Sequence, residues 1–250
     1  MTRDVGGQFM FQTRYELMEP SAQQRGQPQP PLELECDPAA ERIDLPGPAK
    51  LLKAWPIDLT DAIRRRVSVR QYAGQPLTLE ELSYLLWCTQ GVKKVLHGAA
   101  TLRTVPSAGA RHALETYLLA NAVEDLPAGL YRFCATQQKL LKLRQGPGIA
   151  DDLAAACLGQ DFVGAAAVAF CWAAVAYRMT WRYGQRGYRY LLLDAGHVCQ
   201  NLYLAAEAID CGVCAIGAFD DEQVNHVLGI DGTEQFAVYL AAVGKKQSRR

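Results

Sequence analysis

At 250 residues the chain is long enough for one large domain or two small ones, and it can bury a substantial core. Its 26 basic and 26 acidic residues cancel to a formal net charge of +0, which argues against a nucleic-acid-binding protein. The N-terminus lacks the apolar stretch of a signal peptide, and residues 162–176 fall short of the ~20 apolar residues of a membrane span. A soluble cytoplasmic protein is therefore expected.

The first 50 residues are expected to form an arm rather than part of the core. Residues 18–50 are rich in Pro, Gln and Glu and poor in aliphatic side chains, a composition typical of flexible or extended segments. We therefore predict a flexible N-terminal arm over residues 1–50 and a compact domain over residues 51–250.

Short helices and antiparallel strands are predicted for the first half of that domain. A helix is expected over 57–66, followed by strand-like alternation over 67–70. Thr78 and Glu81 form a capping box that opens a helix running to Gly91. Strands are predicted over 113–120, 129–134 and 140–143, the last two paired as a hairpin.

The second half is organised around one long helix. A helix is expected over 149–158 and a buried strand over 162–176. Residues 188–209 are apolar on every side, which predicts a core helix, and Gly212 is expected to end it in a left-handed conformation. A strand over 213–219, a helix over 221–228 capped by Asp220 and Gln223, and a strand over 236–243 complete the domain. Hairpins mixed with helices indicate an α+β fold.

The cysteines favour packing over metal binding. Most of the eight lie in apolar runs, which is typical of reduced thiols in a reducing compartment. Cys211 and Cys214 form a lone CxxC, and zinc needs two further ligands at ordered spacing, so no metal site is predicted. His197 is expected to be a hydrogen-bonded core residue rather than a catalyst.

Four segments carry candidate binding residues. Arg66, Ser68 and Arg70 share one face of an extended segment, and guanidinium groups suit a phosphate or a ring carbonyl, although a solvated basic face is the alternative. The loop around Pro106 offers a flat surface to a planar ring, although a plain turn is the alternative. Gly217 and Ala218 allow a flat ligand to approach the backbone, although simple packing explains small residues equally well. The basic tail at Lys245, Lys246, Arg249 and Arg250 suits a phosphate or serves only solubility.

Taken together, six segments resemble the SagB-type dehydrogenases of the nitroreductase superfamily. They are residues 64–72, 106–120, 129–133, 182–210, 215–231 and 239–244. The resemblance implies a nitroreductase-like α+β fold with a mostly antiparallel sheet flanked by helices. It also implies an FMN enzyme that works as an interlocked homodimer with two flavin sites at the subunit interface.

The same resemblance assigns roles to individual residues. Arg66 and Ser68 are expected at the ribityl phosphate end of FMN and Arg70 at its pyrimidine edge, where a cation stabilises the charge of the reduced ring. Pro106 and Ser107 are expected to approach the ring from the partner subunit. The backbone at Gly217 and Ala218 is expected to face N5, and Arg249 to contact the phosphate.

Three functional hypotheses follow. The first is an FMN oxidoreductase acting on a small organic substrate, such as a nitro- or quinone-reductase supplied by NAD(P)H. The second is an azoline dehydrogenase of a peptide natural-product pathway, for which Tyr183 is the candidate acid or base. Azoline-oxidising relatives have Lys where this chain has Arg182, and Arg stays protonated, which argues against that reaction. The third is a flavin-binding or structural dimer without turnover.

Overall fold

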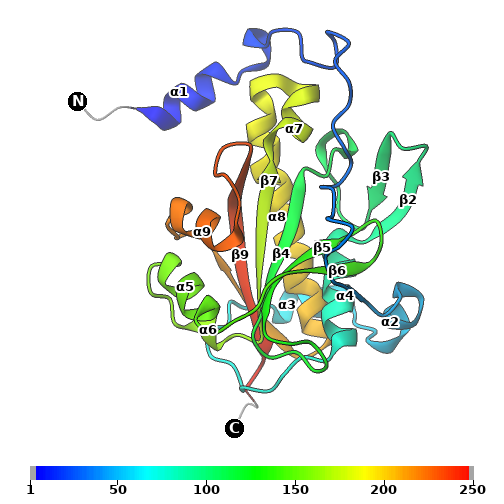
Figure 1. Ribbon diagram of the computed structural model, residues 1–250, viewed down its shortest axis with the longest axis vertical. Coiled ribbons are helices and arrows are strands. Elements are labelled where there is room, and N and C mark those ends of the chain that lie inside the picture. The colour runs from blue at the N-terminus through cyan, green and yellow to red at the C-terminus, as the bar shows by residue number, and fades with distance from the viewer. Residues whose placement is uncertain (1–3, 248–250) are drawn as a thin grey trace.

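A seven-stranded sheet forms the centre of the molecule (Figure 1). The computed structural model describes residues 4–247. The strand order is β1-β6-β5-β4-β7-β9-β8, and every neighbouring pair is antiparallel. The bounds are β1 Arg42–Asp44, β4 Leu114–Ala120, β5 Gly129–Cys134, β6 Lys139–Arg144, β7 Val168–Val175, β8 Cys211–Ile216 and β9 Gln235–Lys245. β2 Val92–Leu96 and β3 Ala100–Arg103 form a separate hairpin.

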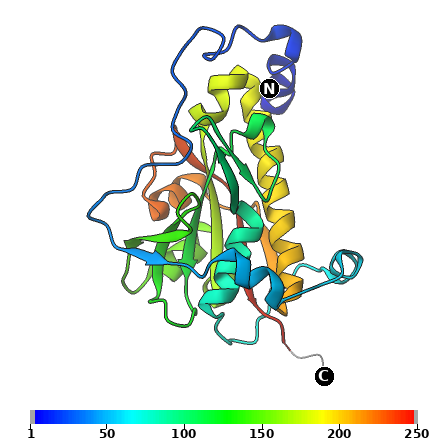
Figure 2. The ribbon, with the colours of Figure 1, turned by 90° about the vertical axis from the view of Figure 1, so that its right-hand side faces the viewer.

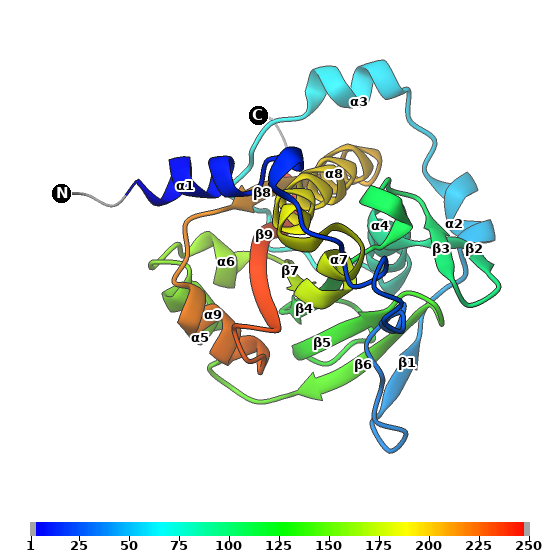
Figure 3. The same ribbon diagram turned by 90° about the horizontal axis from the view of Figure 1, so that it is seen from above.

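Helices cover both faces of the sheet (Figure 3). They are α1 Val5–Gln12, α2 Pro48–Ala54, α3 Leu59–Arg65, α4 Leu79–Gln90, α5 Ile149–Ala156, α6 Phe162–Ala165, α7 Ala176–Tyr183, α8 Gly187–Ala208 and α9 Asp221–Leu228, with 3₁₀ turns at Tyr15–Leu17, Ala108–Ala110 and Gly184–Arg186. α4 and α8 lie on one face, and α5, α6 and α9 on the other. Alternate residues of β7 enter the two cores, Trp172 on the α8 side and Cys171 on the α5 side. The predicted α+β architecture is confirmed.

Local capping signals place two helices as expected. Thr78 Oγ1 accepts a hydrogen bond from the Glu81 amide at 3.1 Å, and Glu81 Oε2 accepts one from the Thr78 amide at 3.0 Å, so the capping box of α4 is complete. Asp220 Oδ1 caps α9 by accepting from the Gln223 amide at 2.9 Å. The Gln223 side chain was expected to accept from the Asp220 amide, but that amide donates to the carbonyl of Ala156 at 2.8 Å, and Gln223 Nε2 donates to the second Asp220 carboxylate oxygen at 3.1 Å.

The long helix α8 is present but is not buried on every side. Figure 2 shows it running along one side of the molecule, and Leu192 and Leu193 are 57% and 59% exposed. No element in residues 4–247 covers that face, so the prediction of all-round burial is wrong for the single chain. The left-handed residue after the helix is Asp210 (φ 52°), not Gly212, which lies inside β8. Within the described chain, no helix is both long and apolar enough to cross a membrane.

The apolar run 162–176 divides into two elements. Its first residues form the single-turn helix α6, and β7 starts only at Val168, so a continuous strand over 162–176 is wrong. The amide of Asn121 explains the break, because its Nδ2 lies 3.2 Å from the carbonyl of Gly164 and 2.9 Å from that of Ala166. These carbonyls are thereby turned away from the sheet ladder.

The N-terminal segment contributes to the sheet. β1, at Arg42–Asp44, pairs with β6, so the sheet begins before the expected domain boundary at residue 51. Upstream of β1 the chain runs past the end of β4 and over α7 (Figure 1). It is held there by the Arg178 guanidinium, which donates to the carbonyl of Pro31 at 3.0 Å. Composition alone did not reveal these contacts, because they are made mainly by backbone groups of the segment.

Candidate functional site

Tyr203 of α8 joins two of the predicted binding segments. Its hydroxyl lies 3.0 Å from Ser68 Oγ and accepts a hydrogen bond from the Ala215 amide at 2.9 Å. The guanidinium of Arg66 lies over its ring, 5.4 Å from the centroid. Tyr203 therefore fixes residues 66–68 beside the end of β8.

The segment 66–70 is extended because it runs beside β8. The Val69 amide donates to the carbonyl of Val213 at 2.9 Å, next to a parallel bridge between Ser68 and Val213. A Cβ on Gly212 would lie 2.5 Å from Val69 Cβ, so glycine is needed for this approach. Arg66 and Ser68 both contact Tyr203, while Arg65 and Val67 line a separate cavity of about 840 Å³.

Gly217 and Ala218 directly follow the last residue of β8 and expose their backbone. Both residues are exposed, and a Cβ at Gly217 would meet nothing nearer than Tyr239 Cε2 at 4.0 Å. Gln160 Nε2 donates to the carbonyl of Ala218 at 2.9 Å and holds the loop in place. Arg70 is exposed near Cys214, where its charge opposes the rise that burial causes in the pKa of that thiol. We call Arg66, Ser68, Arg70, Tyr203, Gly217 and Ala218 the Tyr203 cluster.

A second group of predicted residues gathers nearer the start of α8, around Asp194. Ser107 Oγ donates to Asp194 Oδ2 at 2.6 Å, and the Ala108 amide donates to Asp194 Oδ1 at 3.2 Å. Burial raises the pKa of the Asp194 carboxyl, and these hydrogen bonds partly oppose the rise. Asp194 thus anchors the loop that carries Pro106, which is exposed. Sequence reasoning overlooked Asp194, although an acidic residue on an otherwise apolar helix is a recognisable signal.

Tyr183 packs on the same loop. Gly109 has φ 56°, and a Cβ there would overlap the Tyr183 hydroxyl and lie 2.9 Å from Arg182 Nε. The Tyr183 ring meets the Tyr190 ring edge to face, with centroids 4.9 Å apart. Gly109 therefore permits the tyrosine to sit against the Pro106 loop. We call Pro106, Ser107, Asp194, Tyr183 and Tyr190 the Tyr183 cluster.

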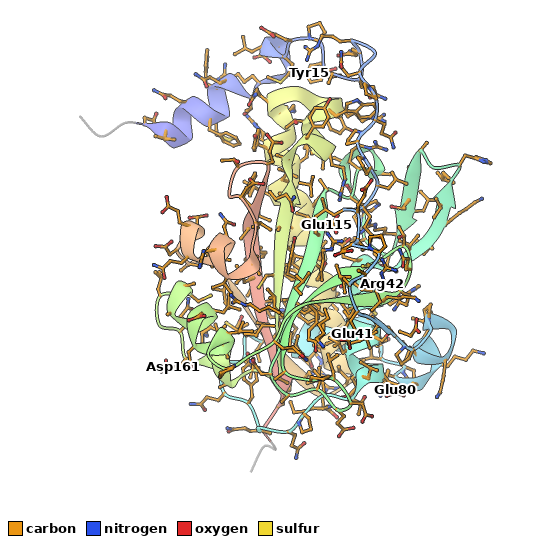
Figure 4. The ribbon with its side chains drawn as sticks, viewed as in Figure 1. Tyr15, Glu41, Arg42, Glu80, Glu115 and Asp161 are labelled. Atoms are coloured by element: carbon orange, nitrogen blue, oxygen red, sulfur yellow. The ribbon has the colours of Figure 1, made fainter. Side chains whose placement is uncertain are left out.

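A cavity of about 520 Å³ opens beside Tyr183. Arg182, Tyr183, Arg186 and Tyr190 line it on one side, and N-terminal residues between Tyr15 and Gln24 line it on the other. Figure 4 labels Tyr15 at the end of the molecule where the N-terminal segment passes α7. The sequence carried no signal for this wall, since residues 18–50 read only as an arm.

The two clusters are separated along one helix. Asp194 and Tyr203 are nine positions apart, which corresponds to about 13 Å along the axis of α8. Exposed residues of α8, among them Leu192, Leu193 and His197, lie on the face that runs between the clusters. His197 was expected in the core and is exposed instead. A single chain therefore does not bring all the predicted binding residues together.

The basic tail is not free along its described part. Lys246 Nζ donates to Glu207 Oε1 at 2.6 Å, and Lys245 pairs with Glu81. Arg249, a predicted phosphate contact, lies outside the described residues. Cys211 and Cys214 are buried in β8. Within residues 4–247, no three His, Cys, Asp or Glu side chains lie close enough together to hold a metal ion.

Comparison with known proteins yields consistent matches. Residues 63–245 match the model of the nitroreductase family. A provisionally named nitroreductase from Methanocaldococcus jannaschii is 35% identical over 190 residues, which cover 76% of this chain and 92% of that protein.

Solved structures agree with this result. A provisionally named nitroreductase from Ralstonia eutropha has a TM-score of 0.69 at 25% identity, covering 89% of this chain and 95% of the other. One from Anabaena variabilis has a TM-score of 0.69 at 30% identity; 84% of this chain is covered but only 42% of that longer chain.

Two more distant structures share the fold alone. A chain of the E. coli microcin synthetase complex has a TM-score of 0.64 at 18% identity, over 86% of this chain and 79% of that one. The NADPH:FMN oxidoreductase of Vibrio harveyi has a TM-score of 0.54 at 16% identity, over 76% of this chain and 69% of that one.

Proposed function

Because the chain belongs to the nitroreductase family of oxidoreductases, we propose that it is an FMN-dependent enzyme moving a hydride between flavin N5 and a small organic substrate. The observation that carries the proposal is that the two clusters, anchored by the buried Asp194 and Tyr203, flank the exposed face of α8. If two copies pair through this face with their α8 helices antiparallel, the Tyr203 cluster of one meets the Tyr183 cluster of the other. Two complete sites then form at the interface.

The exposed apolar surface supports a homodimer. Leu192 and Leu193 on α8 are joined by Leu59 and Ile63 on α3 and by Val67, each more than half exposed. Large apolar side chains left exposed on α8 and α3 are costly in water and are typical of protein interfaces. The same patch on each subunit suits a two-fold contact.

The chemistry of the Tyr203 cluster fits FMN. Arg66 and Arg70 offer guanidinium groups for the phosphate and the pyrimidine edge, with Ser68 as a further donor. Gly217 and Ala218 expose backbone where a planar ring needs to approach closely. When bound, FMN supplies the two-electron hydride chemistry at N5. Pro106 and Ser107 would cover the ring from the partner, and the assignment of Arg249 to the phosphate belongs to the same proposal.

The Tyr183 cluster is proposed to bind the substrate. The cavity of about 520 Å³ beside Tyr183 lies within the size range of small-ligand pockets. The Tyr183 hydroxyl is the group proposed to hold or donate a proton to the substrate. The guanidinium of Arg182 beside it provides positive charge, which favours an anionic or electron-poor acceptor such as a nitro compound or a quinone. NAD(P)H is the proposed electron donor.

The SagB-type assignment within the family is part of the proposal, and the six ordered segments of the sequence support it. An azoline dehydrogenase is the second candidate, favoured by a tyrosine at the edge of a cavity. It is disfavoured by Arg182, which cannot accept the proton released next to a departing hydride.

The direct test is the visible spectrum of the purified protein, followed by chromatography of any chromophore released by heat. A yellow protein that releases about one FMN per subunit and is bleached by NADH or NADPH without oxygen supports a reductase. If neither NADH nor NADPH bleaches the bound flavin but an azoline peptide does, the second candidate is supported. A flavoprotein that no donor reduces indicates a non-catalytic dimer, and a colourless protein that does not bind added FMN contradicts the proposal.

A further inference from the structure

Cys36 and Cys134 form a close pair of thiols between the N-terminal segment and the sheet. Their Sγ atoms are 3.1 Å apart, although 98 residues separate them in the sequence. Cys134 is the buried last residue of β5, and Cys36 is half-buried on the segment that leads to β1. Since a disulfide bond is about 2.05 Å long, an approach of about 1 Å would join them.

Arg132 distinguishes the two sulfur atoms. Its guanidinium donates to Cys36 Sγ at 3.0 Å and to the carbonyl of Glu35 at 2.8 Å, and it is itself only 6% exposed. A buried cation in contact with sulfur stabilises negative charge on that sulfur. Burial raises the pKa of Cys134 to about 12, and its hydrogen bond with Cys36 acts in the same direction. The contact with the Arg132 cation therefore assigns Cys36 as the sulfur that reacts first and Cys134 as its partner.

Contacts on the N-terminal side of Cys36 hold the segment in register with β4 and β5. Glu33 Oε1 accepts from the Ala135 amide at 2.5 Å, one residue beyond Cys134. The Leu34 amide donates to Glu115 Oε1 at 3.0 Å, and Figure 4 shows Glu115 beside this segment. The two thiols therefore face each other because the backbone around both is fixed, not because of side-chain rotation alone.

We propose that Cys36 and Cys134 are a peroxide-oxidisable pair that forms a reversible disulfide tying the N-terminal segment to β5. The Cys36 sulfur attacks one oxygen of hydrogen peroxide and breaks the O–O bond. The leaving hydroxide takes the Cys36 proton and becomes water, which leaves a sulfenic acid on Cys36. The Cys134 sulfur then attacks the Cys36 sulfur; the departing hydroxide takes the Cys134 proton as a second water. Two thiols lose two electrons in total, and one peroxide gains them.

The disulfide would act on a defined part of the molecule. The segment before Cys36 continues to the residues between Tyr15 and Gln24 that wall the cavity at Tyr183. A covalent tie at Cys36 restrains this segment and shrinks the freedom of the unfolded chain. The oxidised protein should therefore unfold at a higher temperature, and dithiothreitol should reverse the change. Neither effect requires bound flavin.

The test uses the full-length protein freed of reductant and treated with increasing hydrogen peroxide. Free thiols are then blocked with N-ethylmaleimide, and tryptic peptides are identified by mass spectrometry. The expected product joins residues 26–42 to residues 133–139, with a mass two hydrogen atoms below the sum of the two peptides. Cys36→Ser and Cys134→Ser should each abolish it. Cys88→Ser, which removes the other half-buried cysteine, should leave its yield unchanged.

The competing outcomes are distinct. Recovery of both peptides with blocked thiols, at peroxide doses that oxidise a small-molecule thiol, would overturn the proposal. So would a disulfide between two chains on a non-reducing gel, or Cys36 converted to sulfinic acid while Cys134 stays free. Because formation of the cross-linked peptide does not require bound flavin, failure of the FMN proposal would not affect this result.

Discussion

At the scale of single residues, Tyr203 and Asp194 organise the candidate site without belonging to a recognisable motif. Tyr203 joins Ser68 to the amide of Ala215, and Asp194 holds Ser107 and the amide of Ala108. Both lie on α8, so one rigid element positions both clusters. The residues proposed to touch FMN are thus held by neighbours that are not expected to touch it.

The role of Arg66 can be tested against its neighbour Arg64. Arg66→Ala should raise the Kd for FMN by about 10- to 150-fold, since a hydrogen bond to a charged group contributes about 1.5–3 kcal/mol. Arg64 lies on the exposed side of α3, where it pairs with Asp61 at 2.8 Å, and Arg64→Ala should leave the Kd unchanged. Quenching of flavin fluorescence during titration measures both. Equal losses in the two variants would indicate a general charge effect and contradict a specific contact.

His112 should make the fold sensitive to acid. Burial, together with the nearby charge of Arg103, lowers the pKa of His112 to about 3, against an ordinary value of 6.5. Between these values the unfolded chain binds the proton and the folded chain does not, so the free energy of unfolding falls as pH falls from 6.5 towards 3. The slope contributed by this group is at most about 1.4 kcal/mol per pH unit.

Urea unfolding at several pH values measures this slope in wild type and in His112→Asn. Asparagine tolerates the left-handed backbone found here (φ 43°), and it does not titrate. The variant should lose less stability in acid than wild type. An identical pH dependence in both proteins would show that His112 is not the responsible group.

At the scale of elements, the contact between β8 and the segment 66–70 decides where the basic residues lie. Gly212→Ala should cost about 1–3 kcal/mol, because the new Cβ would overlap Val69, and it should weaken FMN binding by displacing Ser68. Gly164→Ala is the matched control, since its Cβ would meet only the carbonyl of Ala150 at 3.9 Å. Urea unfolding compares the two. A Gly212→Ala protein as stable as the Gly164→Ala protein would refute the close approach.

Elements with strong local signals were predictable from the sequence, and elements set by long-range contacts were not. The capping box at Thr78 and the apolar run of α8 predicted their helices correctly, since both signals act within a few residues. The predicted start of the strand at residue 162 was wrong. β7 begins only at Val168 because of contacts with Asn121, which is more than 40 positions away in the sequence. Arg66 and Ser68 were recognised as sharing a face, but their partner Tyr203 is 135 residues from Ser68 and carried no signal.

At the scale of the whole molecule, the exposed face of α8 predicts an oligomer. Leu193→Glu should convert the proposed dimer to a monomer and abolish FMN binding, because a charge would be buried in the interface. Leu158→Glu is the control: Leu158 is similarly exposed at 65%, but it follows α5 on the other face of the sheet. Analytical ultracentrifugation and flavin content give the answer. A Leu193→Glu protein that stays dimeric would place the interface elsewhere.

In the proposed dimer, each flavin site uses the Tyr203 cluster of one subunit and the Tyr183 cluster of the other. Two variants separate these contributions: Arg66→Ala with Arg70→Ala in one chain, and Pro106→Glu in the other. Pro106 is exposed, so its replacement should not disturb folding of the subunit. Each variant alone should form a dimer with little FMN.

The decisive measurement is the FMN content of hybrid dimers that carry one chain of each variant, purified through two different tags. In a hybrid, one interface site receives every substitution and the other receives none. If the sites are shared between subunits, each hybrid dimer should hold about one tightly bound FMN, half the wild-type content. Hybrids as poor in FMN as the two parent variants would show that each site lies within a single chain and would contradict a site shared between subunits.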